Sequence, residues 1–112
     1  MKTSRQNKND KEVSIVYGSD NSININIFNN KILLEIAGSF DNNLKELEKI
    51  SGAKIYFRGN SIVIKGDRHA NEKVKNAIEY LIHRFRSDKK IDRNDIIASL
   101  NNYMIKDIKN KS

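Results

Sequence analysis

Two short strand-like runs separated by only two residues constrain the fold of this chain more than any other feature. Residues 53–58 (AKIYFR) and 61–65 (SIVIK) are rich in β-branched and aromatic residues, and Gly59-Asn60 lies between them. This spacing predicts a β-hairpin with a tight turn, because glycine and asparagine tolerate the left-handed backbone that such turns require. The predicted register pairs apolar side chains on one face: Phe57 with Ile62, and Ile55 with Ile64.

Periodicity in the rest of the chain places this hairpin in an α+β fold. Isoleucine alternates with asparagine over 22–28, which predicts a strand with one buried face. Residues 31–37 and 43–51 have the apolar spacing of two short helices, and 67–86 that of a long helix with Asp67 as its N-cap. The compact arrangement of these elements is a three-stranded sheet with the helices on one face.

The two ends of the chain are expected to contribute less to the core. Residues 1–20 are polar and predict a flexible tail, although 13–17 (VSIVY) could form a short strand. Asp92 and Asp95 form an acidic variant of a capping box, which predicts a helix after them. We therefore expect four regions: a flexible tail at 1–20, the α+β domain at 21–90, a C-terminal helix at 91–105, and a tail or linker at 106–112.

The charge of the chain has two explanations. A formal net charge of +7 and a pI of about 9.7 suit a polyanionic partner such as a nucleic acid. However, Lys outnumbers Arg by 15 to 6, and the chain also holds 17 Ile and 16 Asn, all residues that A/T-rich codons encode. The base composition of a genome could therefore raise the pI without any polyanionic partner.

Several kinds of chemistry lack the residues that they need. The chain has no cysteine, and His69 and His83 lie apart on one predicted helix, so we expect no metal site. None of the five glycines begins a G-x-x-x-x-G-K-[S/T] phosphate loop, so we expect no cofactor and no catalysis by this chain alone. Because it has neither an apolar run of about 18 residues nor a secretory signal, we expect a cytoplasmic protein without a membrane partner.

The stretch 36–55 resembles the centre of a KH domain, which follows the pattern I-G-x-x-G-x-x-I-K-x-I-x-x-x-[S/T]-G-A-K-I. The residues that fit this spacing are Gly38, Leu44, Lys45, Leu47, Gly52, Ala53, Lys54 and Ile55. Ile36 lies one place off, and Asp41 stands where the second glycine of G-x-x-G is expected. The resemblance implies a KH-like β-α-α-β-β-α fold, in which the turn between the first two helices holds a nucleic-acid backbone.

A closer resemblance covers about residues 22–104. The segments 41–48 (DNNLKELE) and 58–67 (RGNSIVIKGD) are similar to the amino-terminal domain of PhoH-like ATPases. In that family the domain precedes a P-loop ATPase domain associated with phosphate starvation and RNA metabolism. The resemblance implies that ATP and Mg²⁺ bind only through that second domain, which this chain lacks. It also implies that the ATPase domain is a partner of this one, and that a homo-oligomer would form through the full-length protein.

The first candidate site is the glycine turn between the two short predicted helices. It consists of Gly38, Ser39, Phe40 and Asp41, with Asn42, Asn43 and Lys45 at the start of the next helix. Asp41 or Asn42 can cap that helix, which is the first interpretation, and a weakened clamp for single-stranded RNA is the second. In such a clamp the Asp41 carboxylate would repel a phosphate by about 1 kcal/mol at about 4 Å in water.

The second candidate site is the solvent-facing side of the hairpin. The residues expected there are Lys54, Tyr56, Arg58 and Lys65, with Lys54 opposite Lys65. An aromatic ring between cations suits base stacking and phosphate contact. The alternative is that a one-sided sheet simply needs a polar outer face, which lysine and arginine provide.

The function expected from these features is that of an accessory RNA-binding domain of a PhoH-like ATPase, without catalytic activity of its own. The alternative is a protein-interaction or oligomerisation module without nucleic-acid binding, which would use the apolar side of the last helix. Salt dependence separates the two, because RNA binding through phosphate contacts weakens steeply with salt.

Overall fold

The β-hairpin forms as its sequence predicts. The computed structural model describes residues 11–88 and 90–100. In this structure β3 (Lys54–Arg58) and β4 (Ser61–Lys65) pair antiparallel across a two-residue turn, where Gly59 has a φ of 65°. The predicted register of apolar pairs across the hairpin is confirmed.

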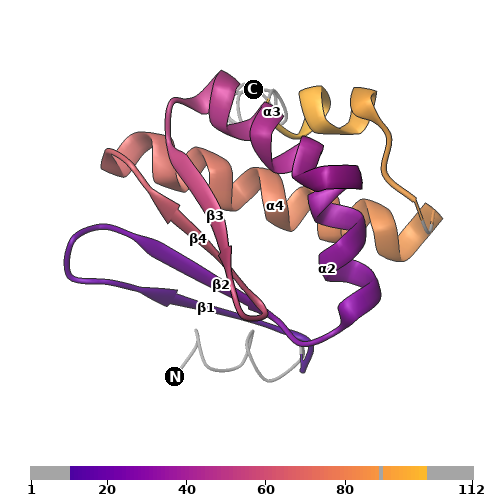
Figure 1. The fold of residues 1–112 in the computed structure, drawn as a ribbon, viewed down its shortest axis with the longest axis horizontal. Coiled ribbons are helices and arrows are strands. Elements are labelled where there is room, and N and C mark those ends of the chain that lie inside the picture. Colours follow the sequence, from indigo (N-terminus) through magenta and orange to yellow (C-terminus); the bar gives the residue numbers. More distant parts are fainter. Residues whose placement is uncertain (1–10, 89, 101–112) are drawn as a thin grey trace, which may run out of the picture.

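The hairpin is one half of a four-stranded antiparallel sheet (Figure 1). β2 (Ile23–Ile27) pairs with β4, and β1 (Val13–Tyr17) pairs with β2, so that the strand order is β1-β2-β4-β3. The predicted three-stranded sheet is therefore wrong, because β1 arises within the region 1–20 that the sequence predicts to be a flexible tail. Val13 is buried opposite Ile27, and β1 is thus stabilised by its partner strand rather than by its own short apolar pattern.

The helices α2 (Asn30–Ala37), α3 (Asn42–Ser51) and α4 (Arg68–Asp88) lie on one side of the sheet (Figure 1). Asp67 Oδ1 accepts a hydrogen bond of 2.8 Å from the backbone N–H of Ala70, which confirms the predicted cap of α4. The isoleucines on the inner face of β2 and β4 are fully buried beneath these helices: Ile23, Ile25, Ile27, Ile62 and Ile64. Burial of each such side chain contributes about 1.5–3 kcal/mol, so this layer is the main source of stability.

A further helical segment at 93–100 follows the long helix. Asp92 and Asp95 each donate a backbone N–H to the carboxylate of the other at 3.0 Å, which confirms the predicted capping box. The remainder of the predicted C-terminal helix and the predicted tail at 106–112 lie outside the described residues, as do residues 1–10 of the predicted N-terminal tail.

Residues 91–100 pack into the same core as the sheet. Ile96 and Leu100 are 1% and 2% exposed. Glu35 of α2 accepts a hydrogen bond of 2.9 Å from the backbone N–H of Ile91, and Arg84 of α4 lies 3.3 Å from the Asp95 carboxylate. Ile96 and Leu100, two of the apolar residues on which the oligomerisation alternative depends, are thus used within the domain, whereas Ile97 is 40% exposed.

Candidate nucleic-acid interface

The turn between α2 and α3, residues 38–41, has a strained backbone. Gly38, Phe40 and Asp41 have φ values of 77°, 54° and 60°, and Ser39–Asp41 forms a single 3-10 turn, η1. A residue other than glycine held in this left-handed region costs about 1–3 kcal/mol. Asp41 therefore occupies the second glycine position of the G-x-x-G spacing with a backbone conformation that favours glycine.

Asn43 holds the 38–41 turn against the end of α2. Its Nδ2 donates a hydrogen bond of 3.2 Å to the carbonyl of Glu35. Its side chain also fills the space beside Gly38, because a Cβ at that position would lie only 2.6 Å from Asn43 Nδ2. The backbone N–H of Gly38 donates to Leu34 at 2.9 Å, and that of Asp41 donates to Gly38 at 3.1 Å. The turn is thus a fixed structure that requires glycine at position 38.

Asp41 does not cap α3 in the way that the sequence predicts. Its side chain makes no capping hydrogen bond, and the backbone of Asn42 is already helical. The physical reason is the backbone of Asp41: a capping residue has an extended conformation that aims its side chain at the first free amides, and a left-handed residue does not. The predicted side-chain cap is therefore wrong, and the exposed Asp41 carboxylate contributes charge to the turn.

The sequence-predicted residues of the turn differ in exposure. Gly38 and Asn43 are half-buried, whereas Ser39, Phe40, Asn42 and Lys45 are exposed. The Phe40 side chain is 89% exposed, more than any other large apolar side chain in the described part of the chain. Core packing therefore gives no reason for a phenylalanine at this position.

The outer face of the sheet brings together the second predicted group. Lys54 faces Lys65 across the hairpin, and Tyr56 and Arg58 follow Lys54 on the same side of β3. All four side chains are exposed, while Val63, which lies opposite Tyr56, is only 2% exposed. Like charges directly opposite one another are destabilising, so the pair of lysines favours an anion between or beside them.

A polar ladder lies on this outer face at the end near the Gly59-Asn60 turn. Asn26 Nδ2 donates a hydrogen bond of 3.1 Å to Ser14 Oγ, and Ser61 Oγ donates to Asn26 Oδ1. Near Lys65, Asp20 accepts hydrogen bonds from the Ser22 side chain and backbone, which lower its pKa, and the charge of Lys65 lowers the pKa further. These side chains have partners within the sheet, and the fold alone accounts for them.

A hollow of about 370 Å³ joins the two predicted groups at the junction of α3 and β3. The residues that line this α3–β3 hollow are Lys45, Glu48, Lys49, Gly52, Ala53 and Lys54. Glu48 Oε2 accepts a hydrogen bond of 2.7 Å from the backbone N–H of Ile55, which engages its carboxylate. Lys49 is not among the sequence-predicted residues, although its position one helical turn after Lys45 indicates that the two share a face of α3. Three lysines thus surround one surface.

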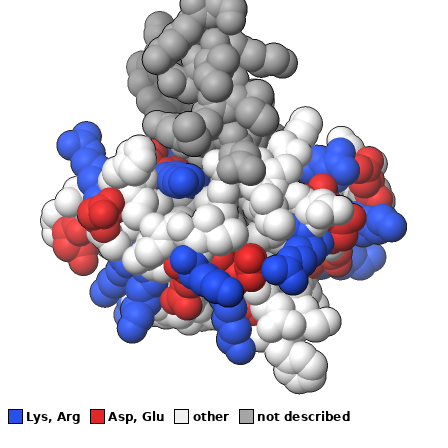
Figure 2. All heavy atoms as spheres, turned by 90° about the horizontal axis from the view of Figure 1, so that it is seen from above, with Lys and Arg blue, Asp and Glu red and all other residues white. Residues whose placement is uncertain are grey.

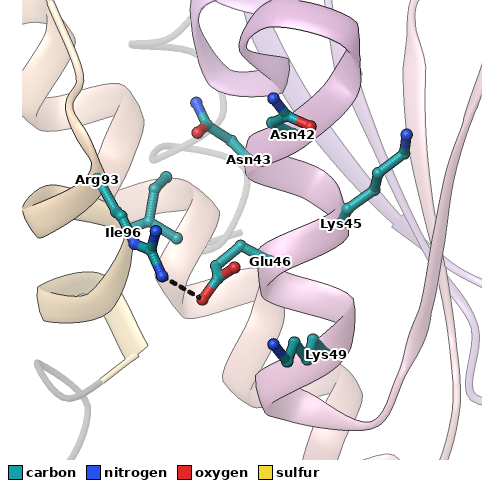
Figure 3. A pocket seen from close by; sticks show the side chains of 7 residues that line it. All are labelled: Asn42, Asn43, Lys45, Glu46, Lys49, Arg93 and Ile96. Atoms are coloured by element: carbon teal, nitrogen blue, oxygen red, sulfur yellow. Dashed lines mark ion pairs between the residues drawn. The ribbon is translucent and has the colours of Figure 1, made fainter.

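The other flank of α3 has the same balance of charged residues. A hollow of about 410 Å³ separates α3 from the segment 93–100, and its lining residues are Asn42, Asn43, Lys45, Glu46, Lys49, Arg93 and Ile96. Across it Glu46 and Arg93 point toward one another, with 3.8 Å between Oε2 and the guanidinium, whereas Lys45 extends away from Arg93 (Figure 3). The charge of Arg93 is therefore balanced on this side.

The net charge of the protein is not gathered into one broad patch on the face that includes α3. Seen from above the view of Figure 1, lysine and arginine side chains stand next to aspartate and glutamate side chains around the described surface (Figure 2). A basic footprint on this face is therefore local, as in the α3–β3 hollow, and does not follow from the overall charge of +7.

Comparisons with known protein families, with curated proteins and with solved structures find no match for this chain. The resemblance to KH domains and to the amino-terminal domain of PhoH-like ATPases therefore stays a prediction. Within residues 11–88 and 90–100, no three His, Asp or Glu side chains gather as they would around a metal ion. No helix of these same residues is long and apolar enough to cross a bilayer.

Proposed function

We propose that this chain is a KH-like domain that binds single-stranded RNA and serves as the accessory domain of a cytoplasmic PhoH-like ATPase. The observation that carries the proposal is the 38–41 turn, which joins two helices and has a positive φ at both glycine positions of the G-x-x-G spacing. The order of elements from β2 to α4 supports it, because strand, helix, helix, strand, strand and helix follow one another as in one class of KH domain.

In this proposal RNA lies along α3, between the 38–41 turn and the edge strand β3. Lys45, Lys49 and Lys54 line one hollow there and would neutralise successive phosphates. Tyr56 and Arg58 continue the same edge of the sheet and would contact the strand beyond Lys54. The outer face near Lys65 would have a minor role, since Lys65 does not line the α3–β3 hollow.

Catalysis is assigned to another domain. The family that this chain resembles would hydrolyse ATP in a P-loop domain, and that domain would be the first protein partner of this one. Oligomers would form through the full-length protein, since Ile96 and Leu100 are buried in the core of this domain. The role proposed for this chain is to hold RNA near the ATPase domain.

A salt-dependent titration with a matched variant tests the RNA proposal. Fluorescence anisotropy of a labelled single-stranded oligonucleotide is measured at about 50 and about 200 mM salt, where three phosphate contacts predict roughly 20-fold weaker binding at the higher salt. Lys45→Ala with Lys49→Ala should reduce the slope of log K against log salt by about 1.4. Lys11→Ala with Lys90→Ala makes the same change of charge away from the α3–β3 hollow and should reduce it far less. Absence of binding at the lower salt would overturn the proposal.

A further inference from the structure

We propose that Phe40 is a base-stacking residue, so that the 38–41 turn contacts a nucleobase rather than a phosphate. This inference rests on the proposed RNA binding and specifies which part of the nucleotide the turn receives. The ring is 89% exposed at the tip of the turn, on a backbone with a φ of 54° and a ψ of 32°.

The first argument is that folding does not require this side chain. A bulky residue at positive φ is a genuine outlier, and asparagine or glycine would adopt the same backbone with less strain. The ring contributes nothing to the core, because Phe40 is the most exposed of the large apolar residues in the described ranges. Strain that folding does not need is typical of a residue that serves a ligand.

The second argument is that the backbone that carries the ring is held in place. Asn43 bonds to Glu35 and fills the space beside Gly38. The amide of Gly38 donates to Leu34 of α2, and that of Asp41 donates to Gly38. A platform held in this way loses little conformational freedom on binding, which favours stacking by a flat partner.

The third argument concerns what the ring can meet. The exposed carboxylate of Asp41 lies next to Phe40 and repels phosphate, whereas a nucleobase is uncharged and offers a flat π-surface. Phosphates have a separate binding place in the α3–β3 hollow. Lys45, one of the residues that line it, lies one helical turn after the 38–41 turn. The base would therefore stack on Phe40 in the turn, and the phosphate would contact the lysines of the hollow.

A protein partner fits the surroundings of Phe40 less well. The residues next to the ring in the sequence, Ser39, Asp41 and Asn42, are polar and exposed, unlike the apolar centre of a stable protein interface. A stable protein interface buries about 800 Å² on each partner around an apolar core. Leu34, 65% exposed on α2, is the matched apolar residue outside the turn and provides a control.

Tryptophan fluorescence tests the inference directly, because the chain contains no tryptophan. In Phe40→Trp, stacking should quench the indole emission as a single-stranded oligonucleotide is added, with the same midpoint as the anisotropy. Phe40→Ala should bind this oligonucleotide about tenfold more weakly, the usual effect of removing one stacked base. It should bind an oligonucleotide of abasic sites as well as the wild type does, and Leu34→Ala should bind both within about twofold of the wild type.

The outcomes separate this inference from the proposal beneath it. If RNA binds with the predicted salt slope while Phe40→Ala has wild-type affinity and the indole is not quenched, base stacking is wrong and RNA binding stands. If no oligonucleotide binds at low salt, both ideas fall. Self-association of the wild type that both Phe40→Ala and Leu34→Ala abolish would assign the ring to a protein contact and would overturn the inference. If Phe40→Ala fails to fold, the fluorescence of Phe40→Trp still tests the inference: quenching by the oligonucleotide supports base stacking, and its absence contradicts it.

Discussion

The 38–41 turn and the outer face of the sheet are both polar surfaces, and they differ in how much of each the fold explains. On the sheet the strands are regular, Asn26 is bonded to Ser14 and Ser61, and alternation alone places the remaining side chains outward. In the turn two residues other than glycine have left-handed backbone, a phenylalanine is exposed, and a carboxylate does not cap its helix. The comparison teaches that a polar surface is a weaker sign of function than backbone strain for which the fold gives no reason.

The largest effect, a loss of stability, is expected from Gly38→Ala in the 38–41 turn. The φ of 77° and ψ of 174° at this position are essentially restricted to glycine, and the new Cβ would meet Asn43. We expect a loss of about 2–4 kcal/mol in the free energy of unfolding, or a fall of roughly 10 °C or more in Tm, by thermal or urea denaturation. Adding Asn43→Ala removes the clash but not the backbone strain, so the double variant should recover only part of the loss. A Gly38→Ala protein as stable as the wild type would show that the turn is loose.

An intermediate effect is expected from Asp41→Gly. Removal of the carboxylate should tighten single-stranded RNA binding by up to about fivefold, which equals roughly 1 kcal/mol. Stability should hold or rise by up to about 1 kcal/mol, because glycine relieves the left-handed backbone. Asp41→Asn is the matched control, since it removes the charge and still tolerates the backbone. It should therefore give most of the gain in affinity. Unchanged affinity in both variants would mean that no phosphate of the RNA approaches the turn.

The smallest effect is expected from Lys54→Ala with Lys65→Ala on the outer face. Relief of the opposed charges should leave stability equal or raise it by about 0.5 kcal/mol. Affinity for RNA should fall only about threefold, because the α3–β3 hollow loses one of its three lysines. The single variants separate the two lysines: Lys54→Ala should lower the affinity for RNA, and Lys65→Ala should leave it unchanged. Equal losses from both would place RNA across the outer face of the sheet instead.

The parts of the fold that the sequence predicts correctly are those set by local rules. The hairpin register follows from a period of two and a two-residue turn, which together leave one consistent pairing for Ile55 and Phe57. The caps at Asp67 and at Asp92 with Asp95 follow in the same way from short-range hydrogen bonding. The sequence favours a flexible tail over the strand β1, because β1 is stabilised by its pairing with β2, and a single short apolar run does not reveal that pairing.

The candidate site was predictable in its residues and not in its geometry. The glycine spacing identifies the 38–41 turn, but the left-handed backbone of Asp41, which rules out the predicted cap, depends on how α2 and α3 meet. In the same way Lys45 and Lys54 were assigned to two separate groups, and only the packing of α3 beside β3 makes them lie around one hollow with Lys49.

The hydrogen bond from Ile55 to Glu48 has a consequence for solubility. β3 is an edge strand, and an edge with free amides is a template on which another molecule can extend the sheet. The Glu48 carboxylate accepts a hydrogen bond of 2.7 Å from one of these amides, that of Ile55. The charged residues Lys54 and Arg58 lie on either side of Ile55 along the strand. A second copy of the chain could pair there only by displacing a carboxylate and bringing like charges together. We therefore expect Glu48→Ala to promote intermolecular β-pairing, seen as aggregation on storage, and a protein equally soluble after this change would refute the protective role.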